Sequence, residues 1–169
     1  IAYENIPAIE TWKAMEKLVE KGLVKRIGVS NFTIELLEKF LKSGKVTIKP
    51  YLNQVERNLF LQQDALVDYC NQKGIIVAGY RSIGGPKDSQ KPENPVLLEN
   101  PVLNEIAKEL GKTPAQIAIN FLLQADPHSV VLAKSINPDR IRSNFELEFE
   151  LNETQMNRLK AENRGIRLC

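Results

Sequence analysis

Residues 130–144 read VVLAKSINPDRIRSN and join a predicted strand directly to a predicted helix. The run 130–133 is apolar, which is typical of a strand in a parallel sheet, and it ends at Lys134. Asn137 is a preferred helix N-cap and Pro138 suits the first helical position, so we expect a helix to begin there. The carboxyl end of a strand is therefore followed within a few residues by the amino end of a helix.

Cationic and polar side chains surround this junction. Lys134 ends the strand, and Arg140 and Asn144 fall four residues apart on one face of the predicted helix. The first N–H groups of a helix are unpaired and its amino end is partly positive, so the junction should attract an anion. The stretch therefore predicts a phosphate-binding site, although the two cations would also suit the solvated cap of one helix.

The rest of the chain repeats this alternation of strand and helix. Apolar runs predict three further strands at 27–30, 51–55 and 75–80. Caps, helical spacing and closing glycines predict helices at 7–21, 33–44, 63–73, 101–110, 113–124, 138 onward and 152–159, with a long polar loop at 81–101. Helices between strands imply a parallel sheet, so we expect an α/β fold of the (β/α)8 TIM-barrel class.

Such a barrel needs eight β-α units, and this chain holds four plus a C-terminal helix. We therefore expect residues 1–169 to form a single domain that corresponds to about half a barrel. An open half barrel would leave two unpaired sheet edges, through which the chain could self-associate.

The composition excludes several classes of protein. The chain has 169 residues, of which 43% are hydrophobic, and 23 Lys and Arg against 21 Asp and Glu give a net charge of about +2. This balance does not favour general binding to nucleic acid or to a membrane surface, and no apolar run approaches the roughly 20 residues of a membrane span. With two cysteines and one histidine, we expect no metal site, no disulfide framework and a cytoplasmic location.

Polar side chains follow every predicted strand. The four strands end in Ser30-Asn31, Asn53-Gln54, Tyr80-Arg81 and Lys134-Ser135. The active face of a barrel is formed by the carboxyl ends of its strands, so these groups should converge on one mouth. Amides and a hydroxyl beside an aromatic ring, with cations at the far rim, suit a ligand with a flat amide-bearing ring and a phosphorylated tail.

Four runs carry a family resemblance. GVSNF (28–32), NQVE (53–56), KSINPDRI (134–141) and KPENP (91–95), followed by Leu97 and Leu98, resemble the aldo-keto reductase family. The similarity covers nearly the whole chain, from the fourth barrel helix to just before the C-terminal substrate loop. The resemblance implies that residues 1–169 are the C-terminal half of an enzyme that reduces an aldehyde or ketone to an alcohol with NADPH.

The resemblance also implies cofactor contacts. Ser30, Asn31 and Gln54 match positions that bind the nicotinamide carboxamide, and Tyr80 matches the ring that stacks on the nicotinamide. The residues from Arg81 to Gly84 match the start of the strap over the pyrophosphate. Lys134, Ser135, Asn137 and Arg140 match the 2′-phosphate pocket, and Asn144 matches an adenine contact. The predicted cofactor-binding residues are Ser30, Asn31, Gln54, Tyr80, Arg81, Ile83, Gly84, Lys134, Ser135, Ile136, Asn137, Arg140 and Asn144.

The sequence departs from the family pattern at three places. Arg81-Ser82 follows the stacking Tyr80 where Ser-Pro is usual, so Arg81 either adds a cation for the pyrophosphate or hinders closure of the strap. Arg57-Asn58 replaces His-Pro, and Ser143 stands where an acidic residue often precedes the adenine-contacting Asn144. The catalytic Asp, Tyr, Lys and His of the family precede this half, so we assign no catalytic residue and expect the isolated chain to be inactive.

Two functions from other classes also fit the sequence. One is a non-catalytic nucleotide-binding or protein-interaction module on the same scaffold. The other is a structural half barrel that dimerises through its exposed edges.

Several residues have structural interpretations. His128 precedes the last strand, at the end of the barrel opposite to the mouth, so we expect it in a surface loop. Tyr80 alone would suit a core as well as a cofactor platform, and Glu56 suits a base or an ion-pair partner of Arg26 or Arg57. We expect Trp12 and Cys70 to be packed, and Glu16, Lys17, Glu20 and Lys21 to form an exposed helix face.

Overall fold

Four short parallel strands alternate with helices along the chain, as the sequence predicts. The computed structural model describes residues 6–85 and 93–168. Its elements are α1 (Ala8–Glu20), β1 (Val29–Ser30), α2 (Ile34–Leu41), β2 (Leu52–Glu56), α3 (Asp64–Gln72), β3 (Ile76–Tyr80), the 3-10 helix η2 (Leu97–Glu99), α4 (Pro101–Leu110), α5 (Pro114–Ala125), β4 (Val130–Val131), α6 (Pro138–Ser143) and α7 (Glu153–Lys160).

The strands form one sheet in the order β1-β2-β3-β4, with every pair parallel. The edge strands are shorter than the predicted 27–30 and 130–133, because each pairs with a neighbour on one side only. Single hydrogen bonds continue the ladder beyond them: Tyr51 donates to the Ile27 carbonyl and Leu132 donates to the Gly79 carbonyl, both at 2.9 Å. The prediction of four parallel strands is confirmed, and the lengths of the two edge strands were wrong.

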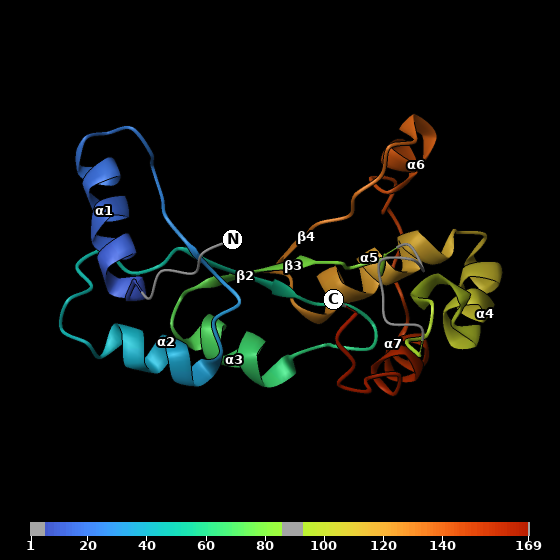
Figure 1. Ribbon diagram of the computed structural model, residues 1–169. Coiled ribbons are helices and arrows are strands. Elements are labelled where there is room, and N and C mark those ends of the chain that lie inside the picture. Colours follow the sequence, from blue (N-terminus) through green and yellow to red (C-terminus); the bar gives the residue numbers. More distant parts are fainter. Residues whose placement is uncertain (1–5, 86–92, 169) are drawn as a thin grey trace.

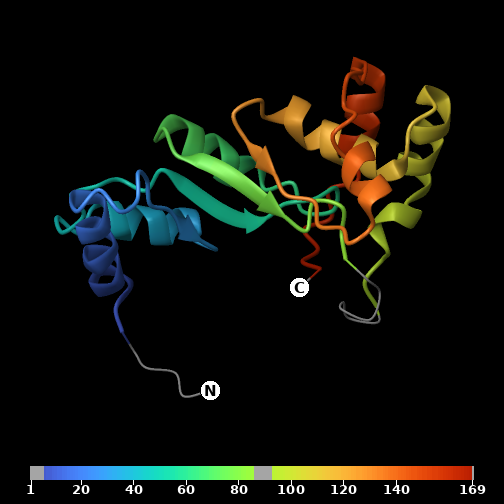
Figure 2. The ribbon, with the colours of Figure 1, turned by 90° about the horizontal axis from the view of Figure 1, so that it is seen from above.

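The arrangement in space is an open half of a (β/α) barrel. Figure 1 shows α1, α2 and α3 on one side of the strands and α4 to α7 on the other, and Figure 2 shows the same separation from above. Within the described residues, no strand pairs with the outer edge of β1 or of β4. Apolar side chains are uncovered near the β4 edge, where Val130 is 41% exposed and Phe145 is 83% exposed.

Local sequence rules explain where the helices begin. The Thr33 side chain accepts a hydrogen bond from Leu36 N at the start of α2, and the Asn137 side chain accepts from two backbone N–H groups at the start of α6. Both α5 and α7 begin with a capping box, built on Thr113 and on Asn152. Each cap satisfies N–H groups that would otherwise lack partners, which is why these four starts follow from the sequence.

Buried apolar side chains form three clusters. One joins α4, α5 and α7 through residues such as Leu103, Ile117 and Leu159. A second lies between the sheet and the helices α2 and α3 and includes the fully buried Cys70. The third holds Trp12, which meets Phe40 edge to face at 5.4 Å and donates from Nε1 to the Ile48 carbonyl. The packing predicted for Trp12 and Cys70 is confirmed.

Glu16 corrects the expected exposed face of α1, because it is 2% exposed. Its carboxylate accepts hydrogen bonds from Thr47 N, Ile48 N and Thr47 Oγ1, all at 2.8 Å, and from Lys13 Nζ at 2.7 Å. Burial by itself would raise the pKa of the Glu16 carboxyl. The hydrogen bonds together have a larger, opposite effect, and the pKa falls to about 2. Lys17, Glu20 and Lys21 are exposed, as predicted.

The predicted loop at 81–101 contains the helix η2 near its end. The described part begins with a tight turn at residues 81–84, in which Gly84 N donates to the Arg81 carbonyl at 2.8 Å. Lys91 and Pro92 of the family-like run 91–95 lie outside the described residues.

Candidate functional site

Predicted nicotinamide contacts meet at the carboxyl ends of the first three strands. The register pairs Ser30 with Gln54, and Ser30 Oγ donates to the Gln54 carbonyl at 2.9 Å. Tyr80 Oη donates to Asn31 Oδ1 at 3.0 Å, across the width of β2. Four predicted site residues are therefore brought together by strand pairing and by two side-chain hydrogen bonds.

The turn after β1 is held by a residue that the sequence did not assign to the site. Asn53 is fully buried, donates from Nδ2 to the Phe32 carbonyl at 2.9 Å and accepts from Phe32 N at 3.4 Å. Asn31 adopts a left-handed backbone with φ of 59°, and its N–H donates to the Gln54 carbonyl. The position of Asn53 within the run NQVE was the only available indication of this role.

Tyr80 and Arg81 are consecutive residues at the end of β3, yet both line one cavity, which is described below. Successive side chains of a strand point to opposite faces, so continuation of β3 would turn Arg81 away from the mouth. Arg81 instead has a left-handed φ of 53°, which ends the strand and redirects its side chain. Gly84 closes this turn with φ of 75°, and a Cβ there would lie 3.0 Å from Leu97 Cβ.

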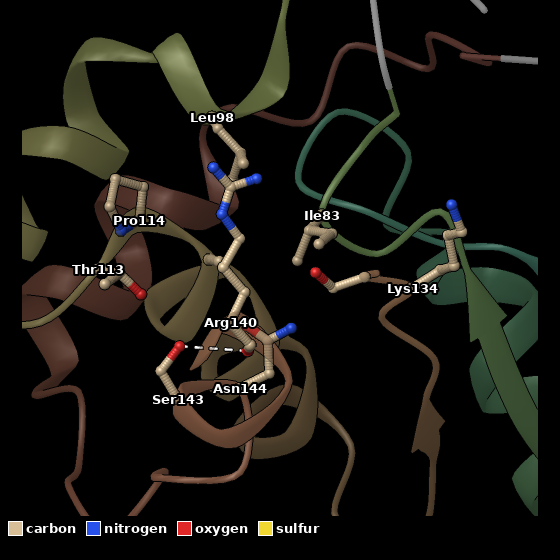
Figure 3. A pocket seen from close by; sticks show the side chains of 10 residues that line it. Ile83, Leu98, Thr113, Pro114, Lys134, Arg140, Ser143 and Asn144 are labelled. Carbon is tan, nitrogen blue, oxygen red and sulfur yellow. Dashed lines mark hydrogen bonds between the residues drawn. The ribbon is translucent and has the colours of Figure 1, made fainter. Parts of the chain in front are cut away.

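The predicted phosphate site lines a cavity of about 310 Å³ beside α6. Lys134, Ser135, Arg140 and Asn144 all contribute to its wall, together with Ile83. Figure 3 shows Arg140 directed toward Leu98 and Pro114, whereas Lys134 lies beyond Ile83 with its ammonium group directed away. One of the two cationic side chains must therefore rotate before both can contact a single phosphate.

Two of the predicted residues between Lys134 and Asn144, namely Ile136 and Asn137, do not line this cavity. Ile136 is 87% exposed, and the Asn137 side chain caps α6 by accepting from Asp139 N and Arg140 N at 2.9 and 3.1 Å. Ser135 Oγ in turn accepts a hydrogen bond from Asn137 N at 3.1 Å. These contacts shape the loop that carries Lys134, so Asn137 has a structural role whatever the ligand.

A second, larger cavity of about 1030 Å³ is lined by Tyr80 and by predicted residues of the turn after β3 and of the α6 region, whereas Ser30, Asn31 and Gln54 do not line it. Its lining includes Tyr80 and Arg81 at the end of β3, Lys134 after β4, and Arg140 and Asn144 at α6. Among the described residues that line it, three are cationic and none is Asp or Glu. This lining, with three cations and no carboxylate among its described residues, fits an anionic ligand.

Glu56, the last residue of β2, and Arg57, which follows it, make contacts with distant parts of the chain. Glu56 is fully buried, and its Oε1 accepts hydrogen bonds from Leu168 N at 2.6 Å and Asn58 Nδ2 at 3.2 Å. Arg57 pairs with the buried Asp126 at 3.9 Å, and burial lowers the pKa of its guanidinium. Arg26 lies over the Tyr51 ring at 3.8 Å. Glu56 therefore anchors the end of the chain.

The described residues also place His128 and bear on metal and membrane sites. His128 is exposed in the turn before β4, at the amino end of that strand, as predicted. Within 6–85 and 93–168, no three His, Cys, Asp or Glu side chains gather in a way that could hold a metal ion. No helix in these ranges is long and apolar enough to cross a membrane.

The fold defines a class of protein, a partial parallel (β/α) barrel with a cavity near the carboxyl ends of its strands. The model of the aldo/keto reductase family matches residues 2–164, and the chain belongs to this family.

Curated relatives give the same result. The chain is 42% identical over 170 residues to mouse estradiol 17 beta-dehydrogenase 5, 41% identical to human aldo-keto reductase family 1 member C2 and 39% identical to bovine prostaglandin F synthase 1. Each match covers 99% of this chain and 52% of the relative. The chain thus spans about half the length of these relatives and corresponds to their C-terminal half.

Proposed function

We propose that this chain is the cofactor-binding half of an NADPH-dependent oxidoreductase that reduces aldehydes or ketones to alcohols. The observation that carries the proposal is the single cavity lined by Tyr80, Arg81, Lys134, Arg140 and Asn144, with three cations and no acidic side chain among its described residues. A dinucleotide with a third phosphate has both the length and the negative charge that this cavity suits.

In this proposal the nicotinamide lies at the carboxyl ends of β1 to β3, and the rest of the cofactor lies along the cavity. Asn31 and Gln54 hold the carboxamide with the help of Ser30, and the ring of Tyr80 stacks on the nicotinamide. Arg81, Ile83 and Gly84 begin the strap over the pyrophosphate. Lys134 and Arg140 bind the 2′-phosphate on a loop shaped by Ser135, Ile136 and Asn137, while Asn144 contacts adenine. When bound, NADPH supplies the hydride that reduces the carbonyl.

In this proposal the residue that donates the proton for that reduction belongs to another part of the barrel. None of the described residues at the mouth forms a group of Asp, Tyr, Lys and His, since His128 lies at the amino end of β4. Residues 1–169 are accordingly proposed to act as one domain that holds cofactor and does not by itself reduce carbonyls. Robust NADPH-dependent turnover by the purified chain would contradict this part of the proposal.

Calorimetric titration of the chain with NADPH and with NADH tests the proposed function. The two cofactors differ only by the 2′-phosphate, so Lys134 and Arg140 should make NADPH bind more tightly by about tenfold or more. Equal affinities would contradict the assignment of these cations, and a folded chain that binds neither nucleotide would contradict the proposal as a whole.

We also propose that the chain is cytoplasmic and self-associates through the outer edges of β1 and β4. The free thiol of the buried Cys70 supports a reducing compartment, and the exposed Val130 and Phe145 beside an open sheet edge support association. Size-exclusion chromatography tests the second point: we expect dimers or larger species, and a stable monomer would contradict it.

A further inference from the structure

The cavity of about 310 Å³ beside α6 is neutral apart from its two cations. Ile83, Leu98, Pro114 and Ala115 give it apolar walls, and no Asp or Glu belongs to its described lining. Its remaining polar side chains carry only hydroxyl or amide groups: Thr113, Ser135, Ser143 and Asn144. The described lining therefore offers a bound base no side chain that can only accept hydrogen bonds.

Asn144, which the proposed function sets against adenine, and its neighbour Ser143 are two of the polar groups that line this cavity. Both are half-buried, and Figure 3 shows them together at the foot of Arg140. Thr113 Oγ1 is occupied, because it donates to Gln116 Oε1 at 3.1 Å and accepts from Gln116 N at 3.2 Å. Ser143 Oγ donates to the Arg140 carbonyl at 3.2 Å, which leaves its lone pairs as acceptors, and a rotation of the hydroxyl makes it a donor to a ligand instead.

Hydroxyl and amide groups can either donate or accept a hydrogen bond, whereas an ionised carboxylate can only accept. The amino group at the 6-position of adenine is a donor, and the oxygen at the same position of hypoxanthine is an acceptor. A wall built from a hydroxyl and an amide can match either base. A carboxylate in the same place would match adenine and oppose hypoxanthine.

We infer that this chain does not discriminate between a 6-amino and a 6-oxo purine in the nucleotide that it binds, and that Ser143 is the residue responsible. The inference rests on the proposed function, which sets the adenine of NADPH against Asn144. Selectivity in this cavity then comes from its shape and from the phosphate contacts of Lys134 and Arg140, and not from the group at the 6-position.

Titration of the chain with NADPH and with its analogue that carries hypoxanthine in place of adenine tests the inference. For the natural chain we expect the two dissociation constants to agree within about threefold. Ser143→Glu introduces an acceptor-only group, so the analogue should bind at least about tenfold more weakly than NADPH. Ser143→Gln is the matched control, because it has nearly the same size, donates as well as accepts, and should keep the ratio within about threefold.

The outcomes separate this inference from the proposed function. A natural chain that binds NADPH but rejects the hypoxanthine analogue by tenfold or more overturns the inference alone, as does an equal ratio for Ser143→Glu and Ser143→Gln. A folded chain that binds neither nucleotide overturns the proposed function, and the inference falls with it. Circular dichroism of each variant checks folding, and the comparison on the natural chain decides the question even if a variant fails to fold.

Discussion

The two ends of the proposed cofactor site are held in different ways. At the nicotinamide end, Ser30, Gln54 and Tyr80 belong to paired strands, and Tyr80 is hydrogen-bonded to Asn31 at 3.0 Å. At the phosphate end, Arg140 lies on α6, a helix of six residues none of which is buried. The first end is fixed by the sheet before a ligand arrives, whereas the second is an exposed segment with full charges.

This difference predicts a division of roles. Groups that are already in place lose little conformational freedom on binding, so the nicotinamide end should contribute geometry and should treat NADPH and NADH alike. Exposed cations contribute mainly charge, so the α6 end should distinguish the two cofactors. Variants at either end can break or sharpen this comparison.

The largest effect is expected from the double variant Lys134→Ala with Arg140→Ala. It removes both cations that line the cavity proposed for the 2′-phosphate, and at such exposed positions each charge-assisted contact contributes about 1.5 kcal/mol. NADPH should bind about 100-fold more weakly, while NADH should change by less than about threefold. Calorimetric titration with both cofactors measures this, and an equal loss for the two would show that the cations do not recognise the extra phosphate.

A second prediction concerns the scaffold of the nicotinamide end. The Glu16 carboxylate ties α1 to the segment that leads into β2, and Glu16→Gln should lower the free energy of unfolding by about 2 kcal/mol, because it replaces hydrogen bonds to a charge. Urea unfolding at neutral pH measures the loss. An unchanged midpoint would mean that the carboxylate does not stabilise this half.

The same carboxylate gives that half a pH dependence. The pKa of Glu16 falls from 4.5 to about 2 on folding, so its contribution is complete above about pH 4.5 and is lost as the pH falls toward 2. Urea midpoints of the natural chain and of Glu16→Gln should therefore converge across this range. Parallel pH profiles of the two proteins would contradict the assignment.

A smaller effect is expected from Tyr80→Phe. This change keeps the aromatic ring and removes the hydroxyl that orients Asn31. Loss of one neutral hydrogen bond costs about 1 kcal/mol, so NADPH and NADH should both bind about fivefold more weakly. Tyr80→Ala also removes the stacking surface and should weaken both further. A loss confined to NADPH would mean that the two ends are not separate in their roles.

Features of the fold that depend on neighbouring residues could be predicted from the sequence. The cap at Thr33 and the capping boxes at Thr113 and Asn152 each involve a contact across three residues. The burial of Glu16 could not be predicted in this way, because its partners Thr47 and Ile48 lie more than 30 residues further along the chain.

The same distinction between local and distant contacts applies to the candidate site. Ser30 lies opposite Gln54, and Tyr80 ends the neighbouring strand, because parallel pairing brings these strand positions to the same part of the sheet. The pairing of Arg57 with Asp126 was missed, since it joins the end of β2 to the turn before β4. The directions of Lys134 and Arg140 depend on side-chain torsions, which spacing along a helix does not determine.

The central claim is that Lys134 and Arg140 hold a phosphate monoester as its dianion. Phosphorus NMR of bound NADP+ across a pH titration tests this directly, because the 2′-phosphate of the free cofactor loses its second proton near a pKa of about 6. Two nearby cations should lower the pKa of the bound phosphate by about one unit, and the double alanine variant should return it to the free value. A bound 2′-phosphate that titrates like the free one would contradict the claim.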